Sequence, residues 1–216
     1  MKLQYLIDSL LSTEIKAEAY VDRYGGVVQT LYYGVVAGED KQITKRYPVA
    51  CDVEGKDCND TNLLFTDLVP NDSRDSVVYW EVIKPMTDAG ATVTKRFDER
   101  RFRGVARLVV WMNVAKLGGG CKDAFFAIAP LEKILTKRLK ITSGVYENSI
   151  VRIRPLKMVA HDINTVFGKY DYDKLKPYYL YPYDYFAIDV EFNLEQCLSK
   201  GGTFTIGADL DCINNV

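Results

Sequence analysis

Hydrophobic residues at the start of the chain recur at the spacing of a helix, and a β-type pattern follows them. The helical positions are Leu3, Leu6, Ile7, Leu10 and Leu11. Gly25-Gly26 interrupts this pattern, and the stretch from Val27 to Val36 is rich in β-branched and aromatic residues. The sequence therefore predicts a helix and then a strand.

Two longer apolar stretches occupy the centre of the chain. Val77–Ile83 predicts a strand that Lys84-Pro85 ends, with a turn at Asp88–Gly90. Arg103–Val114 predicts a second strand. Both of its faces are apolar over the second half, so we expect that half to be buried on both sides.

The elements expected after the centre alternate between helix and strand without a regular period. They are a helix from Ala129-Pro130 to Lys140, a strand at Ile150–Met158, a short helix at His161–Gly168, an alternating strand at Phe186–Asn193 and a last strand at Thr203–Gly207. This order predicts an α+β fold, a mainly antiparallel sheet with two or three helices on one face. We expect residues 1–216 to form a single domain.

Residues 38–75 form a long excursion with little periodicity. Asp, Asn, Gly and Lys dominate it, and Pro48 and Pro70 interrupt it. Nearly 40 irregular residues are long for a connection inside a compact domain. Two interpretations stay open: short strands without a clear pattern, or an arm that becomes ordered against a neighbouring molecule.

Composition narrows the class of protein. The 216 residues are 48% hydrophobic with a net charge of −1, which indicates a folded chain without a global attraction to nucleic acid or anionic membranes. The five cysteines are odd in number and irregularly spaced, which argues against a disulfide framework. The sequence contains no recognisable signal peptide or membrane-spanning stretch, so we expect a protein made in a cytoplasm.

The densest local feature is a tyrosine run that leads directly into the Phe186–Asn193 strand. It contains Tyr170, Tyr172, Tyr178, Tyr179, Tyr181, Tyr183 and Tyr185. Tyrosine combines a large rigid ring with a polar tip. The run could cover the chain's own core, contact another protein chain, or stack on a ligand such as a sugar or a base. Its aspartates and lysines balance, which disfavours nucleic acid.

Other motifs carry little chemistry. His161 is the only histidine and favours a capping or surface role, and Gly118–Gly120 lacks the spacing of a phosphate loop. The acidic residues between Asp52 and Asp60 favour a solvated loop over an ion-binding site such as a calcium site. Arg100, Arg101 and Arg103 favour solvated or inter-subunit ion pairs. We assign no catalytic, cofactor-binding or metal-binding residue.

The layout of helices and strands resembles structural proteins from the neck and tail of tailed bacteriophages, of the tail-terminator or ring-protein type. The carrying features are the N-terminal helix, the Val77–Ile83 and Arg103–Val114 strands, the helix after Pro130, and the late strand entered through Tyr-Pro-Tyr-Asp-Tyr. The tyrosine-rich style is similar to virion proteins of crAss-like phages. The excursion departs from a minimal tail terminator.

The resemblance implies a non-enzymatic virion protein, synthesised in the host cytoplasm and assembled as a homo-oligomeric ring between portal and tail. It implies copies of the chain and neighbouring portal, neck or tail proteins as partners. Neither a membrane nor a specific nucleic acid is implied, although DNA passes through such a ring. The seven tyrosines and the three arginines are the residues we predict at interfaces.

Two rival hypotheses remain. The tyrosine run could serve as a stacking platform in a carbohydrate- or ligand-binding module. Alternatively, Asp189 and Glu191, on the polar face of the late strand, could act as a carboxylate pair in an enzyme. Ordinary exposed strand residues are the simpler explanation of that pair.

Overall fold

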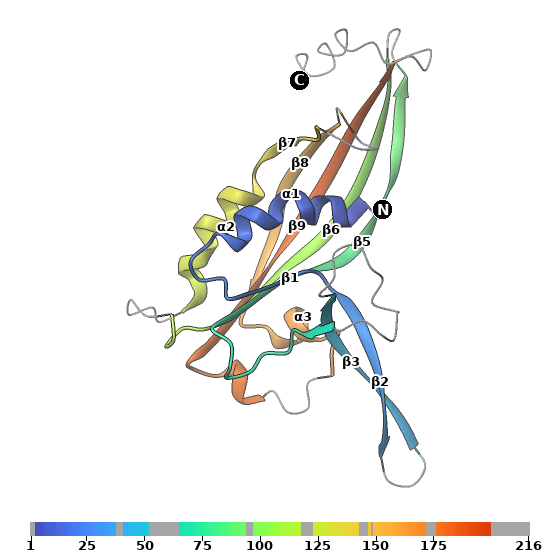
Figure 1. Cartoon of the computed structure of the whole chain (residues 1–216). Helices are drawn as coiled ribbons and strands as arrows, with labels where there is room; N and C mark the ends of the chain where they lie inside the picture. Colours follow the sequence, from blue (N-terminus) through green and yellow to red (C-terminus); the bar gives the residue numbers. More distant parts are fainter. Residues whose placement is uncertain are drawn as a thin grey trace.

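A curled six-stranded sheet forms the body of the protein, which confirms the predicted α+β class (Figure 1). The computed structural model describes residues 3–37, 41–51, 65–93, 97–117, 123–142, 147, 149–171 and 176–199. The main sheet has the order β1-β5-β6-β9-β8-β7, in which β1 runs parallel to β5 and the other pairs are antiparallel. A second, antiparallel sheet has the order β2-β3-β4.

The helices and strands have the following bounds. The helices are α1 (Leu3–Lys16), α2 (Ile128–Leu135) and α3 (Ile163–Phe167), with 3₁₀ turns η1 (Ala124–Ala127) and η2 (Lys176–Tyr179). The strands are β1 (Arg23–Val27), β2 (Gln29–Ala37), β3 (Lys41–Cys51), β4 (Phe65–Asp67), β5 (Ser76–Val93), β6 (Phe97–Asn113), β7 (Arg138–Lys140), β8 (Ile150–Ala160) and β9 (Tyr183–Ser199).

One face of the main sheet carries the larger core beneath α1 and α2. Both helices lie across the same side of the strands (Figure 1). The fully buried residues there include Leu11 and Ile15 of α1, Leu131 and Leu135 of α2, and Leu108, Val110 and Phe186 of the sheet. Removing such side chains from water is the main stabilising contribution to the fold, about 1.5–3 kcal/mol for each one. Two helices therefore share one face, as predicted.

The opposite face has a second core at one end only. There α3 contributes Val166 and Phe167, which pack against sheet residues that include Tyr79, Val109 and Trp111. Residues Leu108–Met112 of β6 are 0% exposed, so the prediction that this half of the strand is buried on both faces is confirmed. The rest of the opposite face carries charged side chains.

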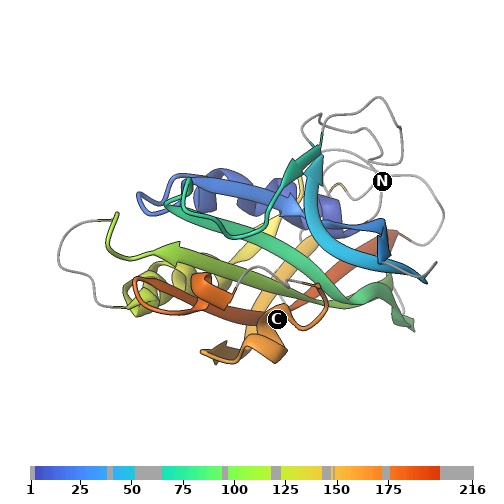
Figure 2. The same ribbon diagram turned by 90° about the horizontal axis from the view of Figure 1, so that it is seen from below.

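Part of the 38–75 excursion is regular rather than irregular. Residues 41–51 form β3, which pairs with β2 over nine positions from Gln29↔Val49 to Ala37↔Lys41, and β4 adds three pairs at the base. Residues 38–40 and 52–64 lie outside the described part of the chain. Figure 1 shows the β2–β3 ribbon, which we call the arm, extending away from the main sheet, and Figure 2 shows the same fold from below. The ordering of this arm against a neighbouring molecule stays a prediction.

The arm is fixed to the body at its base. The backbone N–H of Asp171 donates to the carbonyl of Arg46 at 3.0 Å, and the N–H of Arg46 donates to the Asp171 carboxylate at 3.0 Å. Val49 and Leu68 are at most 3% exposed. The base therefore belongs to the folded body, whereas the ribbon projects from it.

Strand β5 continues past Lys84-Pro85, so the predicted end of this strand is wrong. Its partner β1 pairs only with Val77–Trp80, which leaves the later residues of β5 on an edge of the described sheet. Proline is tolerated on an edge because its missing N–H is not needed for a ladder. The register shifts between Asp88 and Gly90, so the predicted turn there is a bulge within the strand.

The helix predicted to reach Lys140 ends earlier. It ends at Leu135, and the Thr136 hydroxyl donates to the Glu132 carbonyl at 2.9 Å. Arg138–Lys140 then forms β7, with Leu139 paired to Val151. The polar–apolar–polar order of these three residues fits a short strand as well as a helix end, and pairing with β8 decides between them. The strand predicted at residues 203–207 lies outside the described residues.

Candidate assembly surface

Most of the described tyrosine run covers the chain's own second core. The ring of Tyr183 stacks on Trp111 with centroids 5.3 Å apart, and Tyr178 meets Tyr183 edge-on at 5.2 Å. Tyr179 and Tyr185 each lie 5.2 Å from Phe167 of α3. The aromatic rings therefore seal the end of the sheet on which α3 packs.

The seven predicted interface tyrosines have very different exposures. Tyr170 and Tyr185 are 6% and 4% exposed and so belong to the core. Tyr178, Tyr179 and Tyr183 are half-buried, Tyr181 is 79% exposed, and Tyr172 lies outside the described residues. Their role at an interface stays a prediction, for which Tyr181 offers the largest surface.

Tyr183 is held by a hydrogen bond as well as by stacking. Its hydroxyl donates to the carboxylate of Asp72, which raises the pKa of Tyr183 to about 12. Burial, with a smaller contribution from Tyr185, raises the pKa of Tyr179. Both hydroxyls therefore stay protonated at neutral pH, and this end of the sheet face is uncharged at its tyrosines.

Beyond the aromatic end, the same sheet face becomes ionic. Arg107 of β6 donates from Nε to Oδ1 of Asp189 at 2.6 Å and from Nη2 to Oδ2 at 3.0 Å. The Arg107 and Asp189 side chains are 15% and 17% exposed. Arg107 also donates to the Thr165 carbonyl of α3. This half-buried pair marks the boundary between the aromatic end and the charged end.

Glu191 lies two residues further along β9, almost fully covered. It is 4% exposed and accepts hydrogen bonds from Arg103, Arg154 and Asn193. Burial alone would raise the pKa of Glu191, but the hydrogen bonds from Asn193 and Arg103 and the two arginine charges lower it overall. The expectation that Asp189 and Glu191 are exposed strand residues is therefore wrong, because arginines of both neighbouring strands lie over them.

The three predicted interface arginines, Arg100, Arg101 and Arg103, are all exposed. Nε of Arg100 lies 3.9 Å from Oδ2 of Asp88, and Arg103 contacts Glu191. At least two of these arginines therefore form ion pairs within the chain, whereas the sequence favoured solvated or inter-subunit ion pairs. Their role between subunits stays a prediction.

Sequence reasoning did not single out Glu81, which the structure places in the charged cluster. This β5 residue is 5% exposed and lies on the same sheet face as Arg107 and Asp189. Burial raises the pKa of Glu81. The hydrogen bond from Tyr170 and the positive charges of Lys169 and Arg107 lower it, but burial is the larger effect. The period-two pattern of β5 could have placed Glu81 on the face of Tyr79, but the pattern could not show that this face is covered.

His161 is exposed, in agreement with the surface role expected from the sequence, and it pairs with Asp184, which is distant in the sequence. Its backbone has a φ of 55°, and its Nδ1 lies 3.2 Å from Oδ1 of Asp184. The neighbouring Asp162 instead caps α3 by accepting from the N–H of Thr165 at 3.1 Å. The adjacent His-Asp pair therefore has two separate structural roles.

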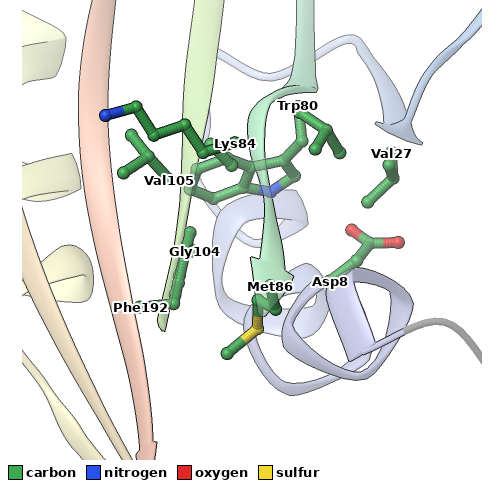
Figure 3. A pocket seen from close by; sticks show the side chains of 10 residues that line it. Asp8, Val27, Trp80, Lys84, Met86, Gly104, Val105 and Phe192 are labelled. Atoms are coloured by element: carbon green, nitrogen blue, oxygen red, sulfur yellow. The ribbon is translucent and has the colours of Figure 1, made fainter. Parts of the chain in front are cut away.

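A small apolar pocket lies between α1 and β5 (Figure 3). The pocket and its mouth together contain about 340 Å³ of space, lined mainly by apolar atoms of residues such as Trp80, Met86 and Phe192. The Asp8 carboxylate of α1 points toward Val27 and Trp80. Tyr24 donates to Asp8, and Trp80 Nε1 donates to the Tyr24 hydroxyl at 3.0 Å. This hydrogen-bonded chain fixes α1 against the sheet, which is a structural role.

The acidic residues of Asp52–Asp60 and the glycines of Gly118–Gly120 lie outside the described residues. Within the described part of the chain, no group of three or more His, Cys, Asp or Glu residues is placed to hold a metal ion. The longest helix of that part, α1, has 14 residues, and none of its helices qualifies as a candidate membrane span. No family model, curated protein or solved structure is detectably similar to this chain.

Proposed function

We propose that this protein is a non-enzymatic structural subunit that assembles with copies of itself into a ring. The setting that its layout suggests is the neck or tail of a tailed bacteriophage, with portal, neck or tail proteins as neighbours. The observation that carries the proposal is the β2–β3 ribbon, which pairs over nine positions and extends away from the main sheet.

A projecting two-stranded ribbon favours a partner on physical grounds. An isolated hairpin is only marginally stable in water, because two strands bury little apolar surface. Contact with a neighbouring molecule would stabilise such an arm. An arm on one copy and a receiving surface on the next would form a heterologous interface, the kind that generates rings.

The edges of the main sheet favour assembly through the arm and the faces rather than through added strands. On β5 the edge carries Lys84, Pro85 and several register shifts, and on β8 it carries Pro155 and Lys157 with a shift between them. Prolines, lysines and bulges prevent another strand from pairing with an edge. Continuous growth of the sheet from copy to copy is therefore disfavoured.

The turn before β9 provides a second contact candidate. Leu180 and Tyr181 are 68% and 79% exposed, the largest exposures among the large hydrophobic residues of the described chain. The alternative function, a ligand platform, would require several exposed rings. Tyr170 and Tyr185 are buried, so Tyr181 is the one mostly exposed ring of the described run.

The test is the mass of the purified protein in solution, measured by light scattering alone and with neighbouring virion proteins. We expect the intact chain to form a closed oligomer. A variant in which Asn-Gly replaces residues 33–45 keeps the base of the arm and should remain folded but monomeric. Tyr181→Ala should weaken assembly without changing the unfolding transition. A wild-type chain that stays monomeric under all these conditions, or a shortened variant that assembles normally, would contradict the proposal.

A further inference from the structure

Arginines from two strands surround the buried Glu191 on the open half of the opposite sheet face. In β-sheet register, Arg103 of β6, Asn193 of β9 and Arg152 of β8 form one row across the sheet. The next row places Glu191 beside Arg154. We call Arg103, Arg152 and Arg154 the arginine surface. Neighbouring strands are about 4.8 Å apart, so the three guanidinium groups lie within reach of one bound segment.

Buried or half-buried carboxylates hold these arginines in place. Arg103 donates to Oε1 of Glu191 from Nε at 2.6 Å and also from Nη2, while Arg154 donates to Oε2 at 3.2 Å. Arg152 donates from Nε to Glu195 at 3.1 Å. Glu191 has a side chain only 5% exposed, so it serves as a fixed support rather than as a contact for a partner.

The guanidinium groups themselves remain accessible. The side chains of Arg103 and Arg154 are 59% and 65% exposed, and that of Arg152 is 36% exposed. A guanidinium carries five N–H donors. The hydrogen bonds found among the described residues use two donors of Arg103 and one of Arg154. Donors therefore remain for an outside acceptor, with the orientation of each arginine already restricted.

The charge of this region is moderately positive. Arg101 lies opposite Glu195 in the register, and Arg138 and Lys140 of β7 extend the same rows, so five arginines, one lysine and two glutamates leave an excess of four positive charges. This excess suits a small number of carboxylates better than a nucleic-acid backbone, whose binding requires many neutralised phosphates. Arginine also pairs with carboxylate in a two-point geometry that lysine cannot match.

We propose that the arginine surface is a docking site for an acidic segment of a partner protein, with the carboxylates of that segment bound by Arg103, Arg152 and Arg154. Glu191 is a positioning residue, because it holds the guanidinium groups of Arg103 and Arg154 without contacting the partner, and Asn193 in turn holds Glu191 by donating to its carboxylate. This site is independent of the self-assembly proposed above and does not need the β2–β3 arm.

Binding of an oligoglutamate peptide to the full chain tests the site, with oligoglutamine and a short DNA duplex measured in parallel. Arg103→Gln/Arg154→Gln should weaken oligoglutamate binding by about tenfold or more, because two charge-assisted contacts are lost. The matched control is Lys16→Gln/Lys133→Gln, which removes the same charge from exposed positions on α1 and α2. The control should bind as the wild type does.

A second variant separates binding from folding. The double arginine variant leaves Glu191 buried without its cations, so Arg103→Gln/Arg154→Gln/Glu191→Gln restores a neutral cluster and should fold while still failing to bind. The site is overturned if the wild type does not bind oligoglutamate, if the lysine control loses binding equally, or if duplex DNA binds more tightly through the same arginines. Light scattering of these variants reports on self-assembly separately.

Discussion

The sheet face opposite α1 and α2 has two ends that differ in solvent exposure, although the same strands form both. At one end, β6 and β9 present Trp111 and Tyr185, and α3 covers them. At the other end, the same two strands present Arg103 and Glu191, and Arg103 remains 59% exposed. The alternation of the strands is continuous across both ends. The difference lies in what covers the strands, so exposure here depends on tertiary packing and not on the strand pattern.

The largest expected effect is a difference in folding stability between substitutions of two tyrosines of the same run, Tyr185 and Tyr181. Tyr185→Ala should lower the free energy of unfolding by about 3–5 kcal/mol, because it removes a buried ring that packs on Phe167 and Tyr179. Tyr181→Ala should change it by less than about 0.5 kcal/mol, since this ring is 79% exposed. Chemical denaturation monitored by fluorescence gives both values. Similar losses for the two variants would show that the run does not divide into buried and exposed parts.

The next effect concerns the ion pair at the boundary between the two ends. Arg107→Met should cost about 3 kcal/mol of folding stability, because Asp189 stays half-buried without its cation. Adding Asp189→Leu should recover much of this loss. Arg103→Met, at the open end, should cost about 1 kcal/mol, because Arg154 and Asn193 still donate to Glu191 and the Arg103 side chain is 59% exposed. A double variant no more stable than Arg107→Met would show that the charge of Asp189 is not the cause.

The smallest effect compares two buried glutamates with opposite pKa shifts. Glu81 has a raised pKa, so its contribution to stability is full below about pH 4.5 and is lost as the pH rises through its folded value. Glu191 has a lowered pKa, so its contribution is full above about pH 4.5 and is lost as the pH falls through its folded value.

At neutral pH, Glu81→Gln should therefore be more stable than the wild type, and Glu191→Gln less stable, each by about 1 kcal/mol. Both differences should shrink in acid. Denaturation midpoints measured from neutral to acidic pH would check the signs. A loss of stability in Glu81→Gln at neutral pH would contradict the assignment of Glu81 as a carboxylate raised in pKa by burial.

The sequence predicts the elements of this fold better than their ends. The sequence predicts three elements well, because the spacing of their apolar residues reflects a buried face. They are the N-terminal helix, the strand after Arg103 and the alternating strand before Asn193. The residues at which β5 and α2 end cannot be predicted from the sequence. Pro85 ends a central strand but not an edge strand, and Arg138–Lys140 suits either a helix or an edge strand. Both outcomes depend on neighbours that are distant in the sequence.

The candidate surface could be predicted only in part. The tyrosine run and the arginines at positions 100–103 stand out in the sequence. The support from Glu191, and the position of Arg152 and Arg154 beside Arg103, depend on β9 lying between β6 and β8. Strand order is not encoded in local periodicity, so the sequence could not bring these residues together.

That strand order also governs when the sheet can form. β9 is the last of the described strands in the sequence, yet it lies between β6 and β8 and pairs with both. Until residues 183–199 have left the ribosome, β6 and β8 each present an unpaired edge beside hydrophobic surface. Long-range pairing of this kind folds slowly and exposes intermediates to aggregation. The six-stranded sheet therefore cannot be completed until β9 is available, and the gap between β6 and β8 stays open until then.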